Sequence, residues 1–117
     1  DENPEMLAEA RRFVPDGDFR ESAAETLPFP DGAFDLVFMG LLLHESDEPW
    51  KVLQEARRVA RLRVCILEWP YRDGAFGPPI TDRLSPVDLE RLAREAGFAG
   101  VTNVDLGETV LWTLVGK

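Results

Sequence analysis

The chain has 117 residues, of which 44% are apolar, 30% charged and 9% aromatic, and its formal net charge is −9. This composition is typical of one globular domain, and no apolar run approaches the roughly 20 residues that cross a bilayer, so we expect no membrane partner. The acid excess argues against nucleic acid, because phosphate affinity comes largely from Lys and Arg. The single cysteine, Cys65, excludes an internal disulfide and a cysteine metal cluster, so we expect no metal and a reducing, cytoplasmic setting.

The first half of the chain predicts one helix and at least one strand. The helix should begin at Pro4, be capped by Asn3, and end before Pro15. Residues 19–22 are a candidate short strand. Residues 34–39 are nearly all apolar and lie between turn residues, a pattern that predicts a buried strand.

The second half predicts two helices and three strands. One helix opens within 46–49, and the other is capped by Ser85 and stops at Gly97. The strands are expected at 64–69, 101–105 and 109–115, the last two joined by a turn near Gly107. Helices alternating with strands indicate a mostly parallel α/β sheet with an antiparallel ending, in one domain over residues 1–117.

Ligands of such sheets bind beyond the carboxyl ends of the strands. Asp1 and Glu2 precede the first helix, where a carboxylate could accept the ribose hydroxyls of a nucleoside cofactor or simply stabilise the helix N-terminus. His44, the only histidine, could act as a general base or could orient its loop through a backbone carbonyl. Trp69 and Tyr71 could wall an apolar pocket or pack in the core.

Five segments match one known pattern in the same order along the chain. They are residues 1–8, 24–37, 42–59, 66–69 and 84–98. The most specific is 24–37, which reads Ala-Glu-Thr-Leu-Pro-Phe-Pro-Asp-Gly-Ala-Phe-Asp-Leu-Val. Together they resemble the later three-quarters of a class I S-adenosylmethionine-dependent methyltransferase, in the group that includes the quinone-biosynthesis C-methyltransferases. The resemblance implies a Rossmann-like, mostly parallel sheet with an antiparallel C-terminal hairpin.

The resemblance also implies S-adenosylmethionine as cofactor and a small-molecule methyl acceptor. By position, it assigns Asp1 to the ribose, Glu2, Ala23 and Ala24 to the adenine region, Met39 and Gly40 to the methionine end, and His44 to the substrate side as candidate base. Ala23 replaces an acidic residue that is frequent in the family, so one contact to the adenine amine is lost.

The family's glycine-rich first strand and loop have no counterpart here, so the expected sheet is N-terminally incomplete. In the family that strand lies beside the strand expected at 34–39, which should therefore have a free edge and an apolar flank. Such edges invite pairing with another chain. We therefore expect that the native protein has the missing strands upstream of Asp1, and the alternative is a rearranged sheet or a homodimer paired through this edge. The alternative function is a non-catalytic or truncated methyltransferase-like domain acting in binding or assembly. A dehydrogenase is disfavoured by the antiparallel ending.

Overall fold

The computed structural model describes residues 1–116, so Lys117, the last residue of the expected domain, lies outside the described residues. Its main elements are α1 (Pro4–Phe13), β1 (Phe34–Gly40), α2 (Pro49–Val59), β2 (Ala60–Glu68), α3 (Pro86–Glu95), β3 (Gly100–Asp105) and β4 (Val110–Val115). A single turn of 3₁₀ helix, η1 (Leu43–Glu45), follows β1. Within residues 1–116, no helix has the length and apolar character needed to cross a membrane.

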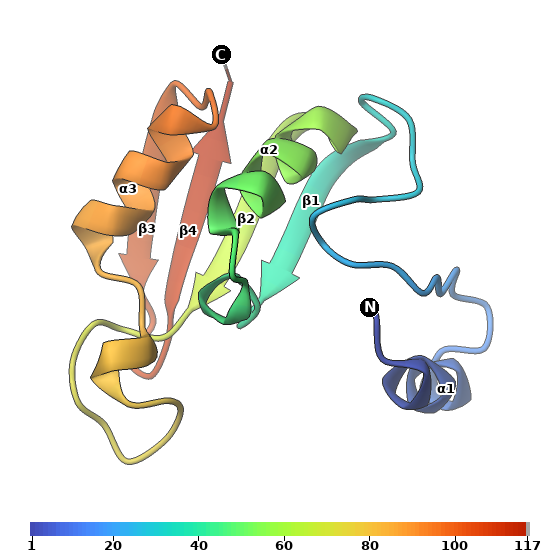
Figure 1. The fold of residues 1–117 in the computed structure, drawn as a ribbon, viewed down its shortest axis with the longest axis horizontal. Helices are drawn as coiled ribbons and strands as arrows, with labels where there is room; N and C mark the ends of the chain where they lie inside the picture. Colours follow the sequence, from blue (N-terminus) through green and yellow to red (C-terminus); the bar gives the residue numbers. More distant parts are fainter. Residues whose placement is uncertain (117) are drawn as a thin grey trace.

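The strands form one sheet in the order β1-β2-β4-β3 (Figure 1). β1 and β2 are parallel and are joined through α2, whereas β4 runs antiparallel to both β2 and β3. A parallel pair needs a crossover of this kind, because a tight hairpin can join only antiparallel strands. The Rossmann-like α/β class with an antiparallel C-terminal hairpin is thus confirmed.

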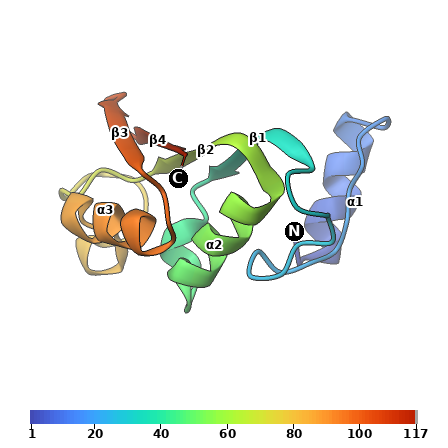
Figure 2. The same ribbon diagram turned by 90° about the horizontal axis from the view of Figure 1, so that it is seen from above.

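The core lies between the sheet and the two later helices, which cover the same face (Figure 2). The apolar residues of α2 and α3 recur at helical spacing and so bury one side of each helix. They pack on strand residues that point to that face. The most deeply buried members are Leu43, Val52, Leu53, Val64, Ile66, Leu89 and Leu114.

The opposite face of the sheet is bare within residues 1–116. Leu36, Phe38 and Val104 expose 51%, 58% and 58% of their surface, although parallel strands are normally covered on both faces. The expectation that residues 34–39 are buried is therefore wrong for most of β1, and Met39, which points toward α2, is its one buried residue. The physical reason is that, within residues 1–116, β1 pairs only with β2 and the helices α2 and α3 lie on the other face of the sheet.

The predicted helix ends are confirmed at α1 and α3. The Asn3 side chain accepts hydrogen bonds from the backbone of Glu5 and Met6, and Ser85 accepts one from Asp88. Gly97 has a φ of +106°, which is the left-handed conformation that ends a helix most easily at glycine.

The candidate strand at residues 19–22 is absent. The segment instead runs beside the residues that precede α1, where Ser22 donates one backbone hydrogen bond of 2.8 Å to Asp1. Asp1 N in turn donates to the backbone carbonyl of Arg20 at 3.3 Å, but two bonds do not make a ladder, because the chain enters α1 directly afterwards and a strand needs a partner that continues alongside it. α1 itself lies beyond the free edge of β1 (Figure 1), and Leu7 is its only buried residue.

Candidate functional site

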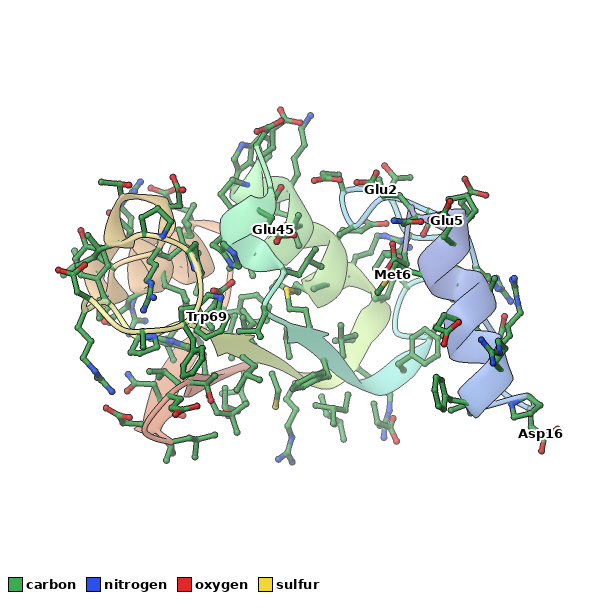
Figure 3. All side chains as sticks on the ribbon, turned by 90° about the horizontal axis from the view of Figure 1, so that it is seen from below. Glu2, Glu5, Met6, Asp16, Glu45 and Trp69 are labelled. Atoms are coloured by element: carbon green, nitrogen blue, oxygen red, sulfur yellow. The ribbon has the colours of Figure 1, made fainter. Side chains whose placement is uncertain are left out.

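An open cleft of about 950 Å³ lies between the start of α1 and the carboxyl end of β1. Its walls come from the segment before α1, the loop at 22–27, the end of β1, and the residues that lead into α2. Figure 3 views the molecule from the carboxyl ends of β1 and β2, with Glu2 and Met6 on one side and Glu45 on the other. The cleft therefore lies where ligands bind in open α/β sheets.

The end of β1 opens into this cleft because the chain turns sharply there. Leu41 adopts a left-handed conformation with φ of 54°, which is uncommon for a residue with a side chain. Its backbone N–H still donates to Leu67 in the neighbouring strand at 2.8 Å. The turn leaves Met39 and Gly40 lining the cleft, at the sheet edge where the sequence predicted them.

The segment before α1 forms the opposite wall. Asp1 Oδ1 accepts a 2.8 Å hydrogen bond from the backbone of Asn3, so this carboxylate helps to cap the helix. Asp1 and Glu2 both line the cleft, and so does Ala24. The structure therefore brings together five of the seven predicted site residues, while Ala23 and His44 do not line the cleft. Their roles in binding or catalysis stay predictions.

The cleft has a strongly acidic lining. Its carboxylates are Asp1, Glu2, Glu25, Glu45, Asp47 and Glu48, and none of its described lining residues is basic. Such a site favours a cation, because the fields of several like charges add in a concave surface. Ser46 donates a 2.8 Å hydrogen bond to Glu25 and joins two walls of the cleft. Sequence reasoning missed this pair, because nothing in the spacing of these two residues indicates that they meet.

The loop before β1 is held in place by an ion pair on α2. Glu55 accepts hydrogen bonds from Leu27 N at 2.8 Å and from Arg58 Nη2 at 2.6 Å, and Arg58 also reaches Asp31 at 2.9 Å. The hydrogen bond from the Arg58 guanidinium lowers the pKa of Glu55 below its usual value, against the desolvation that raises it. These contacts fix the loop that carries Ala24 and Glu25 into the cleft.

His44 lies in η1 with its ring turned inward. Its side chain is only 7% exposed, and Nδ1 lies 3.0 Å from Oε2 of Glu68, the last residue of β2. Glu68 itself is 2% exposed. The structural alternative for His44, that it orients its own loop, is thus supported by a contact, but with a buried carboxylate and not with a backbone carbonyl.

Trp69 and Tyr71 both line a smaller cavity of about 430 Å³ near the end of β2. The loop around it is fixed by Arg83, which is 8% exposed and donates to four backbone carbonyls. These carbonyls belong to Pro70, Arg72, Phe76 and Pro78, at 2.8–2.9 Å. Of the two roles that the sequence left open for Trp69 and Tyr71, the structure favours the wall of a pocket over packing in the core. Nothing in the sequence pattern indicated the role of Arg83.

This arrangement defines a Rossmann-like α/β domain with an acidic ligand cleft at the carboxyl edge of its sheet. Residues 1–63, more than half of the chain, match the family described as a methyltransferase domain. The chain belongs to that family, which confirms the resemblance seen in the sequence.

Two curated proteins to which the chain is similar are demethylmenaquinone methyltransferases. The one from Renibacterium salmoninarum is 36% identical over 73 residues, which are 62% of this chain and 31% of that protein. The one from Chlorobaculum parvum is 35% identical over 65 residues, which are 56% of this chain and 27% of that protein. The matched part of the chain thus spans less than a third of the length of these relatives.

A solved structure of an S-adenosylmethionine-dependent methyltransferase from Aquifex aeolicus has the same fold. It superposes with a TM-score of 0.86 and 26% identity, over 97% of this chain and 65% of that chain. The agreement includes nearly all of the elements described above.

Proposed function

We propose that residues 1–117 form a single, partial methyltransferase domain that holds S-adenosylmethionine in the acidic cleft and serves methyl transfer to a small acceptor. The observation that carries this proposal is the cleft itself. Its volume of about 950 Å³ lies in the range of small-molecule sites, and it is placed at the carboxyl end of β1. Membership of the methyltransferase family supports the same cofactor.

The lining residues fit the charge of this cofactor. S-adenosylmethionine carries a positive sulfur, an ammonium group and one carboxylate, so its net charge is positive, and carboxylates from three segments line the cleft without a basic residue among its described lining. Met6, Phe38 and Met39 add apolar surface on which a flat adenine ring can rest. Asp1 is the candidate for the ribose hydroxyls, because its second carboxylate oxygen has no hydrogen bond in the structure.

Bound there, S-adenosylmethionine would supply a methyl group activated by the positive sulfur. The chain would contribute by positioning the cofactor. Its carboxylates would hold the charged groups, and Met39 and Gly40, at the end of β1, would lie beside the reacting methyl group. Fixing two reactants in line in this way supplies a large share of the rate enhancement, because the entropy of bringing them together is lost on binding.

For the acceptor, we propose a flat ring compound, and demethylmenaquinone is the first to test. The two curated relatives carry that activity in their names. The cavity of about 430 Å³ lined by Trp69, Tyr71 and Trp112 supports a flat acceptor, because aromatic walls pack well on aromatic rings.

The proposal is tested by calorimetric titration of the chain with S-adenosylhomocysteine, the demethylated cofactor product. We expect binding, and we expect Asp1→Asn to weaken it by about tenfold, or ~1.4 kcal/mol. This substitution keeps the hydrogen bond to Asn3 but removes the charge. Asp16→Asn, at the far end of α1 (Figure 3), is the matched control and should bind like the parent chain. Absence of binding contradicts the proposal.

A second candidate function, binding or assembly without catalysis, is favoured by the free edge of β1. Among the described residues 1–116 this strand pairs only with β2, and Phe34, Leu36 and Phe38 expose 41%, 51% and 58% of their surface along it. The unpaired backbone N–H and C=O groups of such an edge can form hydrogen bonds with a strand of another chain. We propose a second copy of this chain as the partner.

Light scattering tests this pairing. We expect a mass of twice the chain's 13.2 kDa, and a single chain for Phe38→Lys, because a charge on an edge opposes pairing. Val87→Lys, at an exposed position of α3, is the control. A monomeric parent chain would contradict the pairing.

A further inference from the structure

A buried carboxylate and the only histidine of the chain meet at the ends of neighbouring parallel strands. Glu68 ends β2, and His44 lies in η1, immediately after β1. Two oxygens of Glu68 lie 3.0 and 3.2 Å from His44 Nδ1. The side chains are 2% and 7% exposed, so water has little access to the contact.

The hydrogen bonds around Glu68 determine which nitrogen of His44 carries the proton. Glu68 Oε1 accepts from the backbone N–H of His44 at 3.0 Å, and Oε2 accepts from that of Trp69 at 3.2 Å. A carboxylate that is held by N–H donors on both oxygens acts as an acceptor, so Nδ1 must donate. The neutral ring then has its lone pair on Nε2.

Nε2 faces outward. Within residues 1–116, Arg57 Nε is the one buried polar side-chain atom without a hydrogen-bond partner. Nε2 of His44 has no hydrogen bond in the structure, so it is in contact with solvent. Glu45 Oε1 lies 3.9 Å from it, and Glu45 lines the large cleft.

We propose that Glu68 is a positioning residue that holds His44 in the Nδ1–H tautomer, and that His44 Nε2 accepts a proton from the methyl acceptor. This inference rests on the proposed function and deepens it. The acceptor would then belong to the class that must lose a proton: a hydroxyl, an amine, or a reduced quinone, whose hydroxyl loses the proton and makes the neighbouring ring carbon nucleophilic.

The step balances as follows. The acceptor gives its proton to Nε2 and uses the electron pair so released to form its bond to the methyl carbon. The electron pair of the broken carbon–sulfur bond stays on sulfur. The ring is then a cation between two carboxylates, Glu68 at Nδ1 and Glu45 near Nε2, which stabilise its charge until the proton passes to solvent.

Magnetic resonance of the chain labelled with ¹⁵N-histidine tests the tautomer directly, because His44 gives the only pair of ring signals. We expect the unprotonated nitrogen to be Nε2. Glu68→Gln should remove this preference. Glu45→Gln, which changes the carboxylate on the other side of the ring, should retain it. An Nε2–H tautomer in the parent chain overturns the proposal and needs no variant that risks misfolding.

Methyl transfer to reduced demethylmenaquinone tests the proton acceptor. His44→Ala should lower kcat by roughly 10²- to 10⁴-fold, the usual contribution of a general base, and added imidazole should restore part of it. The affinity of the His44→Ala chain for S-adenosylhomocysteine should equal that of the parent chain, because His44 does not line the cleft. Transfer at the parental rate by His44→Ala overturns the proposal.

The two failures can be told apart. If the parent chain binds no S-adenosylhomocysteine and transfers no methyl group, the proposed function fails and the base role fails with it, whatever the tautomer. If the cofactor product binds and transfer occurs, but imidazole gives no recovery of His44→Ala, only the base role is overturned.

Discussion

Ser46 donates a 2.8 Å hydrogen bond to Glu25 across the acidic cleft and so joins the loop that leads into α2 with the loop that precedes β1. Both residues line the cleft, and the same hydroxyl accepts a bond from the backbone of Glu48 at 3.1 Å. The contact fixes the separation of two cleft walls that are 21 residues apart in the chain.

Ser46→Ala should therefore weaken both the fold and ligand binding. Loss of a hydrogen bond to a charged partner should lower the free energy of unfolding by about 1–2 kcal/mol. Thermal unfolding with and without S-adenosylhomocysteine measures both effects. Ser22→Ala is the matched control, because Ser22 lines the cleft but its side chain makes no hydrogen bond in the structure. Equal effects of the two substitutions would contradict this interpretation.

The ion pair of Glu55 and Arg58 should make stability depend on pH. Because the pKa of Glu55 is lowered in the folded chain, its stabilisation is present above the ordinary value of 4.5 and is lost as pH falls through the folded value. Urea unfolding at several acidic pH values should show a shallower decline for Glu55→Gln than for the parent. Glu95→Gln, in an exposed pair with Arg91, should leave the slope nearly unchanged. Parallel slopes for Glu55→Gln and the parent would refute this assignment.

Arg83 should determine whether the loop after β2 is ordered. Arg83→Met removes a guanidinium that serves four carbonyls and should lower the free energy of unfolding by about 2–3 kcal/mol. Hydrogen exchange should also rise within residues 70–82. Arg91→Met, which changes a side chain on the exposed side of α3, should change the free energy of unfolding by less than ~0.5 kcal/mol. Unchanged exchange in the loop would mean that Arg83 is not what holds it.

Gly77 approaches Trp69 too closely to tolerate a side chain. Its φ is +86°, and an added Cβ would lie 2.8 Å from the Trp69 ring. Gly77→Ala should displace that ring and lower the melting temperature, whereas Gly74→Ala, with its nearest atom at 4.0 Å, should have little effect. The change in total tryptophan fluorescence between the parent and the variant reports the displacement, because Trp50 and Trp112 are present in both chains. A Gly77→Ala chain with the parental spectrum and stability would show that the loop can relax.

Local sequence signals predicted the parts of the fold that depend on local chemistry. Asn3 and Ser85 cap their helices, and Gly97 ends α3, because each acts on backbone groups within a few residues. The strand expected at 19–22 failed for the opposite reason: a strand exists only with a neighbour. Burial of β1 was overestimated because an apolar sequence does not show which faces other elements cover.

The candidate site was predictable only in part. The resemblance assigned Asp1 and Met39 to one cofactor site, and both residues line the same cleft. The contact of Glu68 with His44 was not predictable, because the two residues are 24 positions apart and the contact depends on the parallel register of β1 and β2. Long-range side-chain pairs of this kind can be identified only after the fold is known.

The weak attachment of α1 has a consequence for energetics. One wall of the cleft belongs to a segment that buries only Leu7 and is tied to its neighbours by a few exposed hydrogen bonds. Such segments open with a smaller free energy than the core does. Occupancy of the cleft would then raise the protection of residues 1–14 against proteolysis far more than that of the sheet, so that affinity and local order rise together.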